Sequence, residues 1–245
     1  MLKLLLPVLF ISISTYANEI KLVTDTWCPF ACEKNSLKQG ILIDVAKQVF
    51  QNHSYKVNYQ TMPFSRALKD TMDGLAQGIV GIQNIPIRKQ FIFPSVPQAT
   101  SKVCFYGPSQ SPWTYRKAEK MEGLRVGAVK DYSYGKEVDD FLTNSQAHIE
   151  VSYGNDALVK NIYKIKANHL DIIVEYEYVA QNLMHTDPKL RLKSLGCSTE
   201  VTELYIAFSP KDPQSTEYAR ILSEGTMMMI KNGKMKKILA NYGVR

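Results

Sequence analysis

The sequence predicts an α/β protein of two lobes, connected by two strands and separated by a ligand cleft. Two observations lead to this expectation. Short apolar or β-branched runs alternate with segments of helical periodicity, which is typical of sheets covered by helices. The alternation breaks after Gly107 in the polar, proline-containing stretch GPSQSPWTYRK and starts again at Leu124. A second lobe explains this interruption most simply.

The first lobe is predicted from a regular strand–helix series. With 45% hydrophobic and 10% aromatic residues, the 245-residue chain can fill one large core or two modest ones. The expected elements are a strand at Ile20–Thr24, a helix opened by Gly40, a strand at Tyr55–Tyr59, a helix capped by Ser65 and a strand with its turn at Gly78–Ile85.

The second lobe repeats this pattern after the interruption. Its expected elements are a strand at Leu124–Val129, a helix after the loop KDYSYGKEV, a strand at Ile149–Tyr153, a helix capped by Asn155 or Asp156 that runs through Ile165, and a buried strand at Leu170–Val174 that ends at Glu175. The chain then closes with a strand at Leu204–Phe208 and two helices, at about Thr216–Lys231 and Lys234–Tyr242.

The lobe boundaries follow from where the chain leaves the first lobe and returns to it. It would leave near Cys104–Gly107 and return near Leu204–Ser209, so these segments form a two-strand hinge. The first lobe then comprises residues 18–107 and 204–245, and the second comprises residues 108–203. Ligands of α/β sheets bind outside the carboxyl ends of the strands, so strand-end side chains of both lobes would meet in the cleft.

Residues 1–17 predict a secretory signal peptide. Lys3 precedes an apolar stretch, Leu4–Ile13, and the small residues Thr15 and Ala17 stand before the expected cleavage at Asn18. This stretch is too short for a membrane anchor, and a buried N-terminal element is the alternative. No cysteine stands at the cleavage site for lipidation. We therefore expect an exported protein without a lipid anchor.

The charge of the chain gives little information about partners. The formal net charge is +7, and the basic residues are scattered along the sequence. The densest cluster, Lys231, Lys234, Lys236 and Lys237, falls on the terminal helices and is interpreted as a solvated face rather than a nucleic-acid or membrane patch. We expect a monomer that binds no nucleic acid.

Four cysteines in an exported chain favour disulfide bonds over metal ligands. Three connectivities are open, and we prefer Cys28–Cys32, a small ring in the loop WCPFACE, together with Cys104–Cys197. A zinc site is the competing interpretation, but the four histidines show no ligand spacing. We expect neither a metal nor a cofactor.

The stretch GIVGIQNIPIRKQFIFPSVP contains a candidate anion site at Arg88. Its apolar start predicts a buried strand, Pro86 interrupts it, and Lys89–Pro94 is expected to return as a second extended segment. Arg88 would lie between them, where its planar guanidinium can bind a carboxylate through two hydrogen bonds. An ordinary surface arginine in a turn is the alternative.

The chain resembles the periplasmic solute-binding proteins of the amino-acid ABC transporter type, that is, type II periplasmic binding proteins of bacterial extracellular solute-binding protein family 3. The resemblance covers nearly all of the mature chain. It rests on the order of these motifs: TDTWCPF, GILIDVAKQVF, MPFSRAL, RKQFIFPSVP, GLRVGAV, LDIIVE and NGKMKKILANYG. It implies a small-molecule ligand bound by hinge closure and an ABC permease as partner.

The resemblance also implies roles for individual residues. Arg88 matches the arginine that binds the ligand α-carboxylate, and Glu175 matches the acidic residue that binds the α-ammonium, where aspartate is commoner. The backbone amides of Ser133–Gly135, at a predicted helix start, could share the carboxylate. A zwitterion needs one fixed cation and one fixed anion, and the two lobes would supply one each.

Two departures from the family pattern concern the anion site. Ile85 stands where the family usually has a threonine that joins the carboxylate network, and Ala76 stands nearest to the place of a usual aspartate. Gln83 could partly compensate for the missing threonine. The ligand is therefore expected to be an amino acid or a derivative, and not necessarily a standard amino acid.

Aromatic residues are expected to line the walls of the cleft. On the first lobe, Trp27 and Phe64 could stack on the ligand, and Asp25 is the expected polar contact, with capping of its own loop as the alternative. Tyr132 and Tyr176 would face them from the second lobe. Phe30 and Tyr134 are the two aromatic residues that we expect to belong to the core.

Two other functions remain open on the sequence alone. One is an exported enzyme similar to cyclohexadienyl dehydratases, with Glu175 as general acid or base. The other is a ligand-binding sensor component that contacts a signalling receptor instead of a permease. We favour a solute-binding protein that is not an enzyme.

Overall fold

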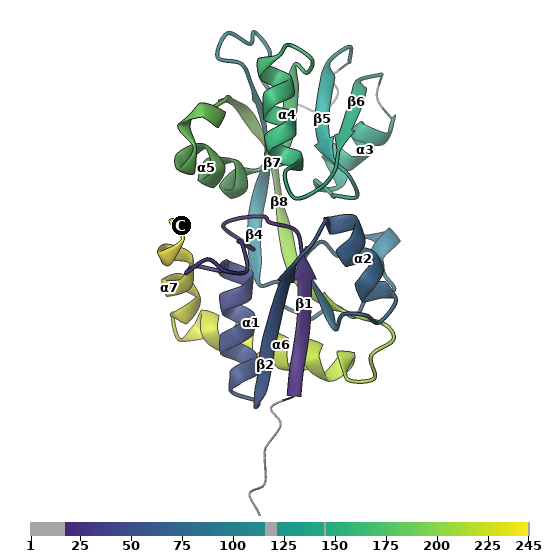
Figure 1. Ribbon diagram of the computed structural model, residues 1–245, viewed down its shortest axis with the longest axis vertical. Helices are drawn as coiled ribbons and strands as arrows, with labels where there is room; N and C mark the ends of the chain where they lie inside the picture. The colour runs from purple at the N-terminus through teal and green to yellow at the C-terminus, as the bar shows by residue number, and fades with distance from the viewer. Residues whose placement is uncertain (1–17, 116–121, 145, 245) are drawn as a thin grey trace, which may run out of the picture.

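The computed structural model describes residues 18–115, 122–144 and 146–244, and the predicted signal peptide lies outside them. The expected α/β fold with two lobes is confirmed (Figure 1). The strands are β1 Asn18–Thr24, β2 Tyr55–Thr61, β3 Gly78–Ile82, β4 Ala99–Gly107, β5 Arg125–Val129, β6 His148–Ser152, β7 Ile172–Tyr176 and β8 Lys193–Phe208. The α-helices are α1 Ile41–Gln51, α2 Phe64–Met72, α3 Lys136–Asn144, α4 Ala157–Lys166, α5 Glu177–Thr186, α6 Ser215–Lys231 and α7 Lys234–Asn241.

All eight strands form one sheet, in the order β2-β1-β3-β8-β4-β7-β5-β6. The pairs at its two ends are parallel, β1 with β2 and β3, and β5 with β6 and β7. The central strands β4 and β8 are antiparallel to each other and to their outer neighbours. The carboxyl ends of β1 and β3 in one lobe therefore face those of β5 and β7 in the other.

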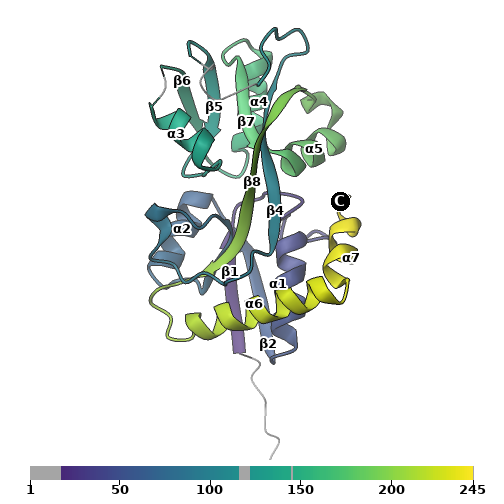
Figure 2. The same ribbon diagram turned by 180° about the vertical axis from the view of Figure 1, so that it is seen from behind.

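Strands β4 and β8 connect the two lobes and run side by side through the middle of the molecule (Figure 2). Their register shifts between Lys102 and Cys104, because Lys102 pairs with Val201 whereas Cys104 pairs with Cys197. The disulfide between Cys104 and Cys197 fixes this pair, and the second disulfide joins Cys28 to Cys32, so the preferred connectivity is confirmed.

The lobe that contains the chain ends has α1 on one face of the sheet and α6 beside it (Figure 1). The inner face of α1 is fully apolar, and Phe50 packs edge-on against Phe208 of β8 and Tyr218 of α6, at 6.1 Å in each case. The two helices approach closely because residue 225 is glycine: a Cβ there would lie 2.4 Å from Val49. None of the described helices is long and apolar enough to cross a membrane.

Two local expectations were wrong, and a third was confirmed but incomplete. Residues 89–94 are not a strand: Arg88 ends a short 3₁₀ turn, Pro86–Arg88, and Ile92 makes only an isolated bridge to Phe208. The strand expected at Leu204–Phe208 is the last part of the 16-residue β8. Helix α2 begins at Phe64 after Pro63, with no side-chain cap, so Ser65 lies inside the helix and does not cap it.

The two disulfides should stabilise the fold to different extents. Cys104 and Cys197 close a loop with a sequence separation of 93 residues, whereas Cys28 and Cys32 are four apart. In the chain-entropy account, a long loop restricts the unfolded chain more, so removing the first pair should cost about 3 kcal/mol more than removing the second. Denaturant unfolding of the two double alanine variants measures the difference, and equal losses would contradict this expectation.

Candidate functional site

The candidate site lies between the lobes, at the strand ends that face each other. The structure brings together all eight residues that the sequence singled out, and each is at most 6% exposed: Asp25, Trp27, Phe64, Gln83, Arg88, Ser133, Glu175 and Tyr176. The first five come from the lobe of β1 and β3, and the last three come from the lobe of β5 and β7. Their roles toward a ligand stay a prediction.

The loop after β1 holds Trp27 in place. Trp27 and Ala31 exchange two backbone hydrogen bonds, of 2.6 and 3.0 Å, inside the ring that the Cys28–Cys32 disulfide closes. Gly81 makes room for the indole, because its φ is +80° and a Cβ would lie 3.2 Å from the ring. The indole Nε1 donates across the cleft to Glu175 Oε1, at 3.2 Å.

Arg88 is buried and is bound by neutral oxygens. Its Nη1 donates to Gln83 Oε1 at 2.5 Å, and its Nη2 donates to the backbone carbonyl of Asp131, in the opposite lobe, at 2.6 Å. The guanidinium also lies 5.6 Å from the ring centre of Phe64. Burial lowers the pKa of Arg88 from its ordinary value, but an arginine stays charged at neutral pH. Among the described residues, no carboxylate lies within ion-pair distance of it.

The hydrogen bonds of Arg88 continue into the second lobe through side chains. Gln83 Nε2 donates to the Tyr176 hydroxyl at 2.9 Å, and that hydroxyl donates to the Ser133 carbonyl at 2.7 Å. Gln83 therefore contacts both Arg88 and the opposite wall, which is the supporting position that the sequence suggested for it.

Two carboxyl groups are buried near each other in the site. Burial raises the pKa of Glu175 to about 8, against hydrogen bonds from the Tyr176 amide and Trp27 that lower it, and the charge of Asp25 raises it further. Burial likewise raises the pKa of Asp25 to about 6, although hydrogen bonds from Tyr132 and Thr24 oppose this. At neutral pH, Glu175 is therefore mostly protonated and Asp25 mostly ionised.

The structure is closed around these residues. The space enclosed between Asp25, Trp27, Phe64 and Tyr132 is about 10 Å³, barely enough for one water molecule. Two larger cavities, of about 660 and 480 Å³, open at the mouth of the cleft, and Ile85 lines both of them. A solute can therefore enter the small enclosed space only after the lobes separate or the side chains between them move, whereas Arg88 also lines the cavity of 480 Å³.

One backbone amide of the Ser133–Gly135 segment is engaged within the protein, and the role of this segment toward a ligand stays a prediction. The Ser133 hydroxyl and the Tyr134 amide both donate to Asp139, at 2.5 and 2.6 Å, so this amide is already occupied. Phe30 and Tyr134 lie in the core, as expected.

Sequence reasoning missed three features of the site. The carbonyl of Asp131 reaches Arg88 from a residue with φ of +63°, and no side-chain pattern indicates this backbone conformation. Gly81 and Asp139 were also missed. A signal for Gly81 exists in the glycines at 78 and 81, which punctuate an otherwise apolar strand.

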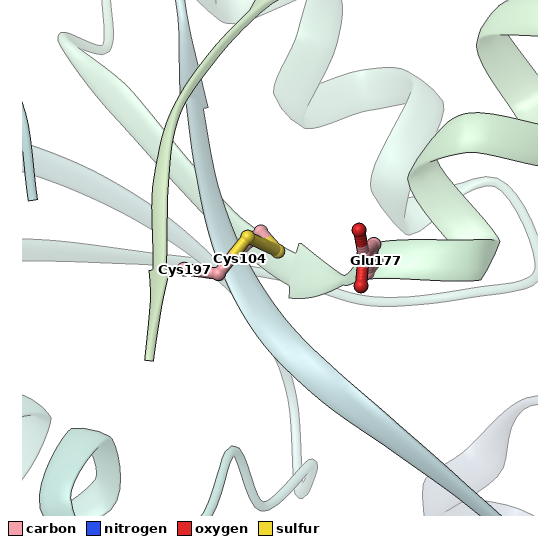
Figure 3. A group of neighbouring side chains, drawn as sticks. All are labelled: Cys104, Glu177 and Cys197. Carbon is pink, nitrogen blue, oxygen red and sulfur yellow. A yellow bond between two sulfur atoms is a disulfide. The ribbon is translucent and has the colours of Figure 1, made fainter. Parts of the chain in front are cut away.

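One group of potential metal ligands lies outside the site. It consists of Cys104, Cys197 and Glu177, of which Glu177 is the first residue of α5 (Figure 3). One potential ligand atom from each residue lies within 4.8 Å of the others. The two sulfur atoms are bonded to each other, so neither is a thiolate that could bind a metal.

The chain belongs to the bacterial extracellular solute-binding proteins, family 3, whose family model matches residues 20–245. Members of this family bind small molecules and work with ABC transporters. A search of curated proteins gave no match.

Several solved structures share the fold at low sequence identity. One is an amino-acid ABC transporter substrate-binding protein from Streptococcus pneumoniae bound to L-arginine, with a TM-score of 0.75 and 19% identity over 92% of this chain and 94% of that one. A second is an ancestral arginine-binding protein bound to arginine, with a TM-score of 0.74 and 18% identity over 92% and 98%. A third is an ancestral amino-acid-binding protein described as a precursor of cyclohexadienyl dehydratase, with a TM-score of 0.74 and 17% identity over 92% and 95%.

The raised pKa of Glu175 predicts that the stability of the unliganded protein falls as the pH rises. Between the unfolded value of about 4.5 and the folded value of about 8, the folded state binds more protons than the unfolded state. Asp25 adds to this slope below pH 6. In Glu175→Gln, the dependence should become much flatter between pH 6 and 8, as measured by the urea midpoint. Glu122→Gln, at an exposed site, is the control, and a wild-type slope in Glu175→Gln would contradict the assignment.

Proposed function

We propose that this protein binds a small zwitterionic solute, an amino acid or a derivative, in the cleft between its lobes and delivers it to an ABC importer. The observation that carries this proposal is the state of Arg88. A guanidinium that is 95% buried and bound only by neutral oxygens is a site for an anionic group. Glu175, which accepts a hydrogen bond from Trp27 across the cleft, offers the opposite charge once it is ionised.

The ligand carboxylate would take the place of Gln83 Oε1 on Arg88, and the ammonium would lie against Glu175. A neighbouring cation favours the ionised form of a carboxyl group, so ammonium binding would lower the pKa of Glu175 and release its proton. The ligand thereby supplies both charges that the unliganded cleft lacks. Gln83 would remain beside the carboxylate, where its amide can donate a hydrogen bond.

The two-lobed architecture supports delivery by hinge closure. The lobes, residues 18–107 with 204–245 and residues 108–203, would rotate about β4 and β8, and closure would bury the ligand. Family membership and the structural neighbours that carry arginine support an amino-acid-like ligand. We place the protein in the periplasm, as a monomer that docks on a membrane permease in its closed form.

Arg88→Ala should weaken ligand binding by roughly a hundredfold, or about 3 kcal/mol, because it leaves a buried carboxylate without its cation. The test is calorimetry with the amino acid that gives the largest shift in a thermal-shift screen of amino acids, polyamines and small carboxylates. Arg66→Ala is a matched control, since Arg66 lies on α2 with a side chain that is 70% exposed. An unchanged affinity in Arg88→Ala would remove Arg88 from the site.

One observation favours a second candidate function, an enzyme on the same fold. Glu175 is fully buried and, with a pKa of about 8, holds a proton at neutral pH, as a general acid must. A structural neighbour is described as a precursor of a dehydratase. Incubation of the wild-type protein with prephenate or arogenate tests this candidate: product formation that Glu175→Gln abolishes would support it, and no product would dismiss it.

A further inference from the structure

Tyr132 crosses the cleft from the lobe of β5 to the wall of the other lobe. It lies in the loop between β5 and α3, and its hydroxyl donates a hydrogen bond to Asp25 at the end of β1. Its ring packs edge-on against Phe64, with 5.0 Å between centres, and against Trp27, at 6.1 Å. Most of its contacts are thus made with the first lobe, although its backbone belongs to the second.

The backbone on either side of Tyr132 is also held. The Tyr132 amide donates to the Val129 carbonyl at 3.3 Å, and the carbonyl of Asp131 accepts from Arg88 across the cleft. Tyr134, two residues on, has its ring centre 6.1 Å away and its hydroxyl accepts from the Val129 amide. These contacts hold the loop, and with it the Tyr132 ring, at its position between the lobes.

That position is the deep end of the cleft on the first-lobe wall. The cavity that remains there, about 10 Å³, is bounded by Tyr132 together with Asp25, Trp27 and Phe64. Without the tyrosine ring, a pocket would open between two aromatic faces with a carboxylate at its base. Such a pocket suits an ammonium or guanidinium group, because aromatic faces and a carboxylate both attract cations.

We propose that Tyr132 is a specificity-determining residue that occupies this pocket in place of a ligand side chain. Its ring restricts the site to zwitterions with short side chains, and its hydroxyl takes the Asp25 oxygen that a second, distal cation would need. This inference rests on the proposed function, because it assigns the ligand class of the same cleft.

The test compares two sets of ligands by calorimetry on wild-type protein and Tyr132→Ala. Glycine, L-alanine and L-serine form the short set, and L-ornithine, L-lysine and L-arginine form the basic set. Wild-type protein should bind a member of the short set at least tenfold more tightly than any of the basic set. In Tyr132→Ala, the ratio of the affinity for the basic set to the affinity for the short set should rise by at least tenfold.

Further variants separate the contributions of bulk and charge. Tyr132→Phe keeps the ring and should still exclude the basic set. Asp25→Asn combined with Tyr132→Ala should lose the gain for the basic set, because the carboxylate is gone. Tyr153→Ala, at a 70% exposed tyrosine of the same lobe, controls for the loss of a tyrosine, and Tyr132→Leu serves if the alanine variant does not fold.

The outcomes distinguish this inference from the proposed function. The role of Tyr132 would be overturned if the ratio of affinities for the short and basic sets were the same in wild-type protein and Tyr132→Ala. It would also be overturned if wild-type protein bound the basic set as tightly as the short set. Either result would leave the proposed function standing. No binding of any zwitterion by any folded variant would overturn the proposed function, and the inference with it.

Discussion

The arrangement of the cleft depends on one constraint, the burial of the Arg88 guanidinium between two lobes. A buried cation is costly unless its donors are satisfied, and here Gln83 and the carbonyl of Asp131 satisfy them from opposite sides. Gln83 in turn donates a hydrogen bond to the Tyr176 hydroxyl, so the contacts of Arg88 extend into the second lobe both through Asp131 and through Tyr176. The same contacts that stabilise the closed form are the ones that an anionic ligand would replace.

Of the two buried acids in the cleft, burial keeps Glu175 neutral, whereas Asp25 is mostly ionised. Glu175 holds a proton at neutral pH, and Asp25 shares its charge with the Tyr132 hydroxyl. The closed cleft therefore contains a cation without an ion-pair partner among the described residues and a protonated acid, and a zwitterion would supply a partner for each. The long antiparallel strands β4 and β8 connect the two lobes, and the Cys104–Cys197 disulfide joins these strands to each other.

Much of the fold follows from periodicity, and the exceptions have a common cause. Residues 193–203 carry an irregular mixture of exposed and buried positions, and they are a strand because β4 pairs with them, a tertiary contact that local pattern does not report. Arg88 and Glu175 could be singled out from the sequence because they are charged residues near predicted strand ends and because the order of the motifs around them resembles that of the family. The Asp131 carbonyl could not be predicted, because it depends on a local backbone conformation and on how the lobes meet. Tyr132 was expected on the facing wall, but its hydrogen bond to Asp25 also depends on how the lobes meet.

The most direct test of the central claim is the pKa of Glu175 with and without ligand. The pKa is measured from the pH dependence of the carboxyl ¹³C chemical shift, and the Glu175 signal is assigned by its loss in Glu175→Gln. If the cleft holds a zwitterion between Arg88 and Glu175, the pKa should fall from about 8 toward or below the ordinary value of 4.5 when the ligand binds. A pKa that stays near 8 in the saturated complex would contradict the account, because the ligand ammonium would then not be paired with this carboxylate.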